Sequence, residues 1–370
     1  MTAPQDLPYF RDSKDLPAPL PTKAEILAST DILTGSEPWA FRKVVAVSEF
    51  YIAKYGPSNS QIEGENLLFL ERHNFRGVAP RLYAMWREDD GTLFIVMERL
   101  PGETLQSLWP ALEEADKSCI LARTRELLSR VHDVPHEGFF GSVDGSHLHH
   151  LIFYWPNYPA HVSGPFTTER DMIKGFAAKS RLEAQNNSRI SYLADFYEEQ
   201  LVGSLAVEGR APVFTHCDLQ RKNILVEVVE GTAENGKDFR VSLVDWESAG
   251  WYPVYWEYFV AFISLKWDDD WCSKFVQAVD SWPAEAAMMK IRNLGHVSSI
   301  WNDIEGVGAV VINQMPSNYP GHWNSGGVHN NQSLIDEPAD RLSSDNRQHA
   351  DHSAQKHGVI CDSSICTMLS

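Results

Sequence analysis

The sequence predicts an α+β protein in which a small antiparallel β-sheet with one helix precedes a mainly helical part. Two hairpin patterns, one on either side of an amphipathic helical pattern, predict the first part. Apolar residues that recur at helical spacing after Pro101-Gly102 predict the second. These patterns divide the chain into a proline-rich arm at 1–24, the sheet part at 25–100, the helical part at 101–315, and a tail at 316–370 whose composition is typical of disorder.

The arm contains five prolines, which lack a backbone donor and oppose both helix and sheet. We therefore expect an extended segment rather than a folded domain. Two β-rich runs follow, Val44–Val47 and Phe50–Lys54, on either side of Ser48-Glu49. This spacing predicts an antiparallel hairpin with Lys54 on its second strand.

The helix of the sheet part is expected directly after this hairpin. Glu63, Leu67 and Leu70 stand at i, i+4 and i+7 on one helical face, so one carboxylate points inward with the apolar stripe. Further along, Asp90-Gly91 lies between two apolar runs within residues 81–100. This dipeptide is a strong turn signal and predicts a second hairpin.

The part after residue 101 combines helices with short strands. Strands are expected at 213–215, 224–229 and 239–244, the last two joined by a turn-rich loop. Apolar helical segments return from about 254 to 311. Two periodic sets of apolar residues predict the helices before the strands: Ile120, Leu127, Leu128 and Val131, then Ile190, Leu193, Tyr197 and Leu201.

Composition and charge exclude several classes of function. The 370 residues hold 32 Lys and Arg against 50 Asp and Glu, a formal net charge of −18. Such a charge repels phosphate backbones and anionic lipid surfaces, so we expect neither a nucleic-acid nor a membrane partner. The five Cys lack the spacing of a disulfide framework, and no basic-then-apolar signal opens the chain. We therefore expect a cytoplasmic protein.

The most informative string is VFTHCDLQRKNILV at 213–226, followed by VSLVDWE at 241–247. Asp218 lies in a loop, where a carboxylate can accept the proton of a substrate hydroxyl. Asn223 begins the next strand, and Asp245 ends an apolar strand about twenty residues later. Both offer the hard oxygen ligands that Mg²⁺ prefers, so this spacing predicts phosphoryl transfer.

On these residues the chain resembles the aminoglycoside phosphotransferase and choline kinase superfamily, the small-molecule relatives of protein kinases, over about residues 40–300. Strings such as IVMERLPGETL and DWESAGWYPVYWEY are similar to those of fungal members of the superfamily. The resemblance implies a protein-kinase-like, two-lobed fold with ATP and Mg²⁺ between the lobes. It also implies a small hydroxylated acceptor, cationic molecules included.

The resemblance further implies roles for the residues of the string. Asp218 would be the catalytic base, and His216 the structural residue that opens its loop. Asn223 and Asp245 would be the Mg²⁺ ligands.

The nucleotide would be bound by residues of the sheet part. Lys54 would hold the ATP phosphates and pair with a helix carboxylate. Glu63 is the expected partner because it shares a face with the apolar stripe, and Glu65 is the alternative. The segment around Glu98 and Leu100 resembles the hinge of the family, whose backbone groups would bind the adenine edge.

Three features depart from the family pattern. Cys217 stands where Gly is commonest. Gln220-Arg221 replaces the frequent His-Pro, so Arg221 or Lys222 would supply positive charge to the transferred phosphate. No Gly-x-Gly-x-x-Gly precedes the Lys54 strand, which leaves the short turn at 47–50 to cover the phosphates.

These departures keep other interpretations open. A degenerate kinase that binds nucleotide or a protein partner without turnover is the main alternative. A hydrolase that uses His216 and Cys217 would need oxyanion donors and an orienting group that the sequence does not display. The string WDDDW at 267–271 suits a cationic acceptor, or equally an aromatic core beside an acidic helix start.

Overall fold

The chain forms two compact units, Met1–Val297 and Ser298–Ser370, and the residues described below all belong to the first. The tail expected at 316–370 and the end of the helical part, 291–315, lie outside the described residues. The computed structural model describes residues 4–37, 40–206, 208–230 and 237–290.

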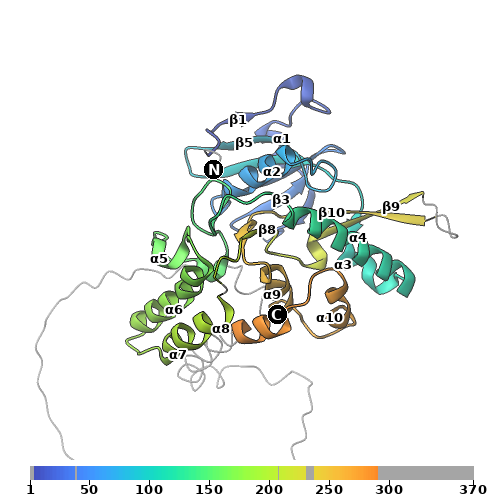
Figure 1. The fold of residues 1–370 in the computed structure, drawn as a ribbon. Helices are drawn as coiled ribbons and strands as arrows, with labels where there is room; N and C mark the ends of the chain where they lie inside the picture. The colour runs from blue at the N-terminus through green and yellow to red at the C-terminus, as the bar shows by residue number, and fades with distance from the viewer. Residues whose placement is uncertain (1–3, 38–39, 207, 231–236, 291–370) are drawn as a thin grey trace, which may run out of the picture. The chain divides into compact units, whose positions relative to one another are not determined.

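Six antiparallel strands form one sheet in the first part of the chain. They are β1 (Tyr9–Phe10), β2 (Asp31–Thr34), β3 (Lys43–Ala46), β4 (Tyr51–Gly56), β5 (Leu82–Arg87) and β6 (Leu93–Glu98). Their order across the sheet is β1-β5-β6-β4-β3-β2 (Figure 1). The two predicted hairpins, β3–β4 and β5–β6, are confirmed.

Helix α2 (Ile62–Arg72) lies against one face of this sheet and is the predicted amphipathic helix. Its apolar residues Leu67 and Leu70 are buried, as the spacing predicts. At Gly64 a Cβ would lie 2.6 Å from Sδ of Met85 on β5, so glycine lets the helix approach the sheet closely. The neighbouring Glu63 is thereby brought within reach of Lys54 on β4.

The arm differs from the expected segment without regular structure. Strand β1 joins the edge of the sheet and pairs Tyr9 with Met85. Helix α1 (Lys23–Ala28) begins with a capping box between Thr22 and Glu25. The prolines exclude long elements, but the two residues of β1 lie between them and remain free to pair.

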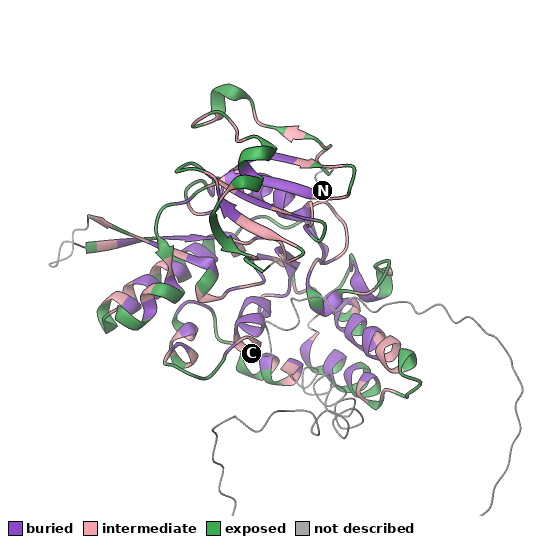
Figure 2. Ribbon diagram, turned by 180° about the vertical axis from the view of Figure 1, so that it is seen from behind, coloured by how far each residue is buried: buried purple, intermediate pink, exposed green. Residues whose placement is uncertain are grey.

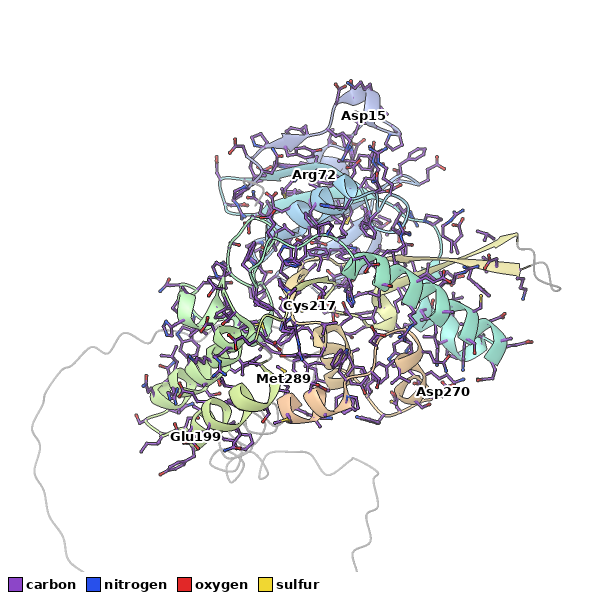
Figure 3. All side chains as sticks on the ribbon, viewed as in Figure 1. Asp15, Arg72, Glu199, Cys217, Asp270 and Met289 are labelled. Carbon is purple, nitrogen blue, oxygen red and sulfur yellow. The ribbon has the colours of Figure 1, made fainter. Side chains whose placement is uncertain are left out.

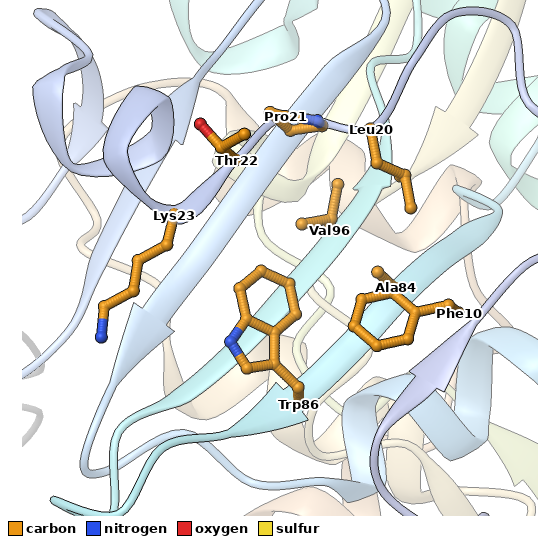
Figure 4. Close-up of a pocket in the computed structure, with 8 residues that line it drawn as sticks. All are labelled: Phe10, Leu20, Pro21, Thr22, Lys23, Ala84, Trp86 and Val96. Carbon is orange, nitrogen blue, oxygen red and sulfur yellow. The ribbon is translucent and has the colours of Figure 1, made fainter.

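The two faces of the sheet bury separate apolar clusters. Ile95 of β6 belongs to the large core on the α2 side, whereas Ala53 and Val96 pack with Ile26 of α1 on the outer side. An apolar concavity of about 260 Å³ lies between the arm and this outer face (Figure 4). It contains none of the predicted site residues, since Lys54 alternates with Ala53 and points to the other face.

The part after residue 101 is mainly helical, as predicted. Two short strand sets accompany the helices: β7 (Glu103–Thr104), β9 (Ile224–Glu230) and β10 (Lys237–Leu243) in the order β10-β9-β7, and β8 (Val213–Thr215) beside β11 (Gly250–Tyr252). The helices are α3 (Leu105–Leu108), α4 (Glu114–His132), α5 (Ala160–Ser163), α6 (Glu169–Asn186), α7 (Tyr192–Phe196), α8 (Val202–Leu205), α9 (Trp256–Ile263) and α10 (Trp271–Lys274). One-turn 3₁₀ segments occur at Ser13–Asp15, Trp109–Ala111, Leu151–Phe153, Arg221–Asn223 and Phe275–Gln277, and a π-helical turn at Tyr197–Leu201.

The periodic residues behave as predicted in α4 and less well further on. Ile120, Leu127 and Val131 are buried along α4. Ile190 lies before α7 and is 75% exposed, so the second periodic set holds only from Leu193 onward. Figure 2 shows the buried residues concentrated in the sheet and on the inner faces of the helices.

None of the helices in the described part of the chain combines the length and the apolar character needed to cross a bilayer.

Candidate active site

Buried Lys54 lies at the centre of three carboxylates, of which Glu63 is buried and the other two are partly exposed. Its Nζ is 2.8 Å from Oε2 of Glu63, 2.8 Å from Oδ1 of Asp245 and 2.9 Å from Oε2 of Glu247. Only 4% of Lys54 is exposed, and Arg42 also binds Oε2 of Glu247. The ion pair with Glu63 is the one that the shared helical face predicts, whereas Glu65 bonds to the arm instead.

The charges of this cluster depend on one another. Burial alone would lower the pKa of Lys54, but the three carboxylates raise it well above its usual range. Burial would raise the pKa of Asp245, yet Lys54, followed by Lys222 and Arg42, holds it well below its usual range. Burial raises the pKa of Glu63 to about 7 against the pull of Lys54. Lys54 and Asp245 therefore carry opposite full charges at neutral pH.

The catalytic-loop string is anchored by His216, which is fully buried. Its Nδ1 accepts the backbone N–H of Asp218 at 3.2 Å, and its Nε2 lies 3.0 Å from the carbonyl oxygen of Val244. This pattern assigns the ring proton to Nε2. Burial lowers the pKa of His216, so the ring is neutral and ties the loop to the residue before Asp245.

A second buried anchor is Glu257, on α9. Its Oε2 accepts the backbone N–H of His216 at 2.8 Å and that of Cys217 at 3.5 Å. Burial raises the pKa of Glu257 to about 7. Cys217 itself, labelled in Figure 3, is 1% exposed. Its Sγ accepts the indole N–H of Trp256 at 3.1 Å. Burial raises the pKa of the Cys217 thiol well above its usual range, which removes it as a nucleophile at neutral pH.

Asp218 and Asn223 are bonded to each other. Nδ2 of Asn223 donates to Oδ2 of Asp218 at 2.7 Å and to its carbonyl oxygen at 2.9 Å. Gln220 Nε2 donates to the other carboxylate oxygen, Oδ1. Because the amide nitrogen of Asn223 faces Asp218, its Oδ1 is directed elsewhere and is left as an acceptor.

The oxygen donors next to this pair fit a divalent cation. The backbone N–H of Val244 donates to the carbonyl oxygen of Asn223 at 3.0 Å, which brings Asn223 beside Asp245. Asp245 uses Oδ1 for Lys54 and has a second carboxylate oxygen. An amide oxygen together with a carboxylate is the donor set that Mg²⁺ accepts. Glu63 and Glu247 each bring an oxygen within 4.8 Å of Asp245, although Lys54 Nζ already lies among the three.

The predicted hinge lies at the end of β6. The backbone N–H of Glu98 donates to Arg81 O at 2.9 Å, and that of Arg99 to Phe50 O at 2.9 Å. For the N–H of Leu100, the described residues offer no acceptor within hydrogen-bond distance. This donor is therefore available at the position where the family resemblance expects the adenine edge.

The two cations of the loop lie in different environments. Arg221 binds Oδ2 of Asp269 at 2.7 Å and stacks near the rings of Trp109 and Trp271, at 5.4 and 5.5 Å. Lys222, by contrast, is half exposed, with Nζ 3.7 Å from Oδ2 of Asp218. Of the two, Lys222 is the cation beside Asp218.

Two carboxylates of the acidic string at 268–270 are paired with cations of the protein. Besides binding Arg221, Asp269 accepts the backbone N–H of Trp271 at 2.9 Å, at the start of α10. Asp270 binds Lys117 at 2.9 Å and Trp109 Nε1 at 2.7 Å. These contacts favour the helix-start interpretation of the string over an acceptor wall.

Sequence reasoning missed three residues of the site. Glu247 shares Lys54 with Asp245, Glu257 holds the loop backbone, and Asn66 on α2 donates to the carbonyl oxygens of Trp246 and Ala249 at 2.7 and 3.2 Å. For Glu247, the one available signal in the sequence was its position two residues after Asp245. Glu257 and Asn66 could not be found, because their partners are backbone groups distant in sequence.

A lysine paired with a helix carboxylate, a loop Asp bonded to an Asn, and a second Asp bound to the same lysine are the site elements of a kinase-type enzyme. The chain matches the model of the phosphotransferase enzyme family over residues 49–290, which include these groups. The chain belongs to this family.

The chain is also similar to solved structures, at low sequence identity. They include a thermostable mutant of aminoglycoside phosphotransferase APH(4)-Ia in its apo form, at 16% identity and a TM-score of 0.44, covering 70% of this chain and 77% of that one. The streptomycin-ATP-APH(2")-IIa ternary complex has 14% identity and a TM-score of 0.43, covering 72% and 81%. ADP-bound APH(2'')-Ib has 12% identity and a TM-score of 0.45, covering 77% and 87%. A search of curated proteins found no match.

Proposed function

We propose that this chain transfers the γ-phosphoryl group of ATP, in the presence of Mg²⁺, to a hydroxyl of a small molecule. The observation that carries the proposal is the convergence of four groups from separate segments: Lys54, Asp218, Asn223 and Asp245. Residues up to 191 positions apart in sequence meet here at hydrogen-bond distance.

Asp218 is the proposed base. Its two oxygens accept from Asn223 and Gln220, and each keeps a further lone pair with which it can accept a proton. The hydroxyl oxygen of the acceptor would attack the γ-phosphorus while the bond from that phosphorus to the β-phosphate oxygen breaks. Asp218 takes the hydroxyl proton, and ADP leaves.

The other groups bind and orient. Lys54 would pair with phosphate oxygens of ATP, and backbone groups of Glu98 and Leu100 would bond to the adenine edge. Asn223 Oδ1 and the Asp245 carboxylate would hold Mg²⁺, which when bound neutralises charge on the phosphates. Lys222 would add positive charge beside the transferred group.

A degenerate kinase that binds nucleotide or a protein partner without turnover is the second candidate. The contact of Lys54 with Asp245 favours it, because the ammonium group holds one of the two carboxylate oxygens and leaves a single oxygen for the metal. The strained Cys217, with φ of 70°, is a second departure from the family pattern in the same loop.

The experiment separates binding from transfer. We expect ATP with Mg²⁺ to raise the thermal stability of the wild type, by about 2.7 kcal/mol at a hundredfold excess over Kd. Asp245→Asn should lose the Mg²⁺-dependent shift. Asp218→Asn should keep the shift and lose transfer to a panel of hydroxylated amines and neutral hydroxylated molecules, measured as ADP release.

Asp238→Asn is the matched control, since Asp238 lies on β10 and pairs with Arg123 outside the site. It should bind and transfer as the wild type does. A shift without transfer to any acceptor would favour the degenerate kinase. Equal activity in all variants would overturn the site assignment.

A further inference from the structure

The segment Gln5–Arg11 of the arm runs along α2 and bonds to both ends of that helix. At the first turn, the backbone N–H of Gln5 donates to Oε1 of Glu65 at 2.6 Å. The carbonyl oxygen of the same residue accepts from Nε2 of Gln61 at 2.7 Å, and Gln61 Nε2 also donates to Glu65 Oε1 at 3.0 Å. Both backbone polar groups of Gln5 are thus used on α2.

At the last turn of α2, Arg11 forms the second attachment. Its two terminal nitrogens donate to the two carboxylate oxygens of Glu71, and its Nε donates to the carbonyl oxygen of Leu82 at 2.8 Å. The side chains of Arg11 and Glu71 are 11% and 12% exposed, so water screens this pair little. Burial would raise the pKa of Glu71, but Arg11 holds it below its usual range.

Between the two attachments, the arm is fixed to the sheet. Strand β1 pairs with β5, and the backbone N–H of Arg11 donates to Tyr83 O at 2.9 Å. Leu7 and Tyr9 pack against the large core. The arm therefore joins helix α2 to the β5 edge at three points, and shifting α2 against the sheet would break several of these bonds together.

Helix α2 carries Glu63, whose carboxylate is 2.8 Å from Lys54. It also carries Asn66, which bonds to the backbone on either side of the Glu247 turn. A displacement of α2 would change the distance from Glu63 to Lys54 and the anchoring of the segment that follows Asp245. In kinase-type enzymes, the lysine–glutamate pair must be in place for transfer.

We propose that the arm is a clamp on α2, in which Gln5 and Arg11 are positioning residues that keep Glu63 against Lys54. Its effect on phosphoryl transfer rests on the function proposed above. Its effect on the Lys54–Glu63 pair does not. The clamp accounts for the burial of Glu65, which is only 3% exposed and whose Oε1 accepts from Gln5 and Gln61.

The first test is directed at the bond between the backbone of Gln5 and Glu65. Gln5→Pro deletes the N–H that binds Glu65, whereas Gln5→Ala keeps it and is the matched control. The readout is acetylation of Lys54 by limiting acetic anhydride, followed by mass spectrometry of its peptide. We expect Gln5→Pro to raise the Lys54 rate about tenfold, since loss of a hydrogen bond to a charged group shifts a local opening equilibrium at least that far. Gln5→Ala should match the wild type.

The second test uses the other attachment. Arg11→Ala removes the arm from Glu71, and Arg76→Ala is its control because Arg76 binds the same carboxylate at 3.1 Å from outside the arm. We expect Arg11→Ala, and not Arg76→Ala, to speed Lys54 acetylation and amide hydrogen exchange in residues 62–72. In transfer assays it should raise KM for ATP more than it lowers kcat.

The outcomes are separable. Equal Lys54 acetylation in Gln5→Pro and Gln5→Ala, or faster exchange of α2 with Lys54 acetylation unchanged, would overturn the clamp. The acetylation readout needs no nucleotide, so it decides the clamp even if the wild type binds no ATP. A wild type that binds no ATP would overturn the proposed function and leave the clamp untouched.

Discussion

Cys217 shows how a single residue can combine strain with a stabilising contact. Its φ of 70° lies in the left-handed region, which costs a side chain with a Cβ about 1–2 kcal/mol. Against this, the thiol is buried and accepts the indole N–H of Trp256. Asp245 has a similar φ of 67°, so both the loop and the position proposed to bind the metal use a backbone conformation that favours glycine.

We predict that Cys217→Gly destabilises the protein despite relieving the strain. Relief gains about 1 kcal/mol, but the lost thiol burial costs about 1 kcal/mol and the unpartnered indole N–H of Trp256 another 1–3 kcal/mol. The net loss is about 1–3 kcal/mol, measured by urea unfolding. Cys217→Ser keeps an acceptor for Trp256 and should lose less. A glycine variant more stable than the wild type would show that strain dominates.

The one-turn segment Arg221–Asn223 is an element whose three residues have three different surroundings. Arg221 is held between two tryptophan rings and Asp269, Lys222 is half exposed beside Asp218, and Asn223 is buried against Asp218. The 3₁₀ turn separates successive side chains by about 120°, which lets neighbours face opposite sides.

From this arrangement we expect the loss of Lys222 to affect the rate of transfer and the loss of Arg221 to affect stability. If the proposed function is right, Lys222→Ala removes charge beside Asp218 and should lower kcat about tenfold, with stability changed by less than about 0.5 kcal/mol because the side chain is half exposed. Arg221→Ala removes a cation–π and ion-pair contact and should cost about 2 kcal/mol of unfolding free energy. Kinetics and urea unfolding of the same two proteins check both. The reverse pattern would mean that Arg221 serves the phosphate.

Elements defined by local pattern were predictable, and those defined by distant partners were not. The β3–β4 and β5–β6 hairpins and α2 follow from turn dipeptides and apolar spacing within about twenty residues. Strand β1 pairs with β5 across more than seventy residues, and no local pattern records such a pairing. The same holds within the site: the motif predicts Asp218, Asn223 and Asp245 as a group, but not Glu257, which only the fold brings under the loop.

At the scale of the whole molecule, the pH dependence of stability is set by carboxyl groups whose pKa values are shifted in opposite directions. Asp245, whose pKa is held below its usual range, contributes stability that is lost as the pH falls towards that lowered pKa. Glu257, whose pKa is raised to about 7 by burial, acts in the other direction. The folded protein keeps its proton up to about pH 7, while the unfolded chain releases it near the usual value for Glu, so unfolding releases a proton in between.

We therefore predict that Glu257 makes the protein lose unfolding free energy as the pH rises from about 4.5 through 7, on the order of 3 kcal/mol in total. Glu257→Gln keeps an oxygen for the backbone N–H groups of His216 and Cys217 but cannot titrate. As the pH is lowered from 8 to 5, the free energy of unfolding of the wild type should therefore rise relative to that of this variant. Urea unfolding at fixed ionic strength measures this difference. Glu113→Gln, a change at an exposed position before α4, should show no such trend. A difference between wild type and Glu257→Gln that is constant with pH would mean that Glu257 is ionised throughout, with its charge stabilised by the two loop N–H groups alone.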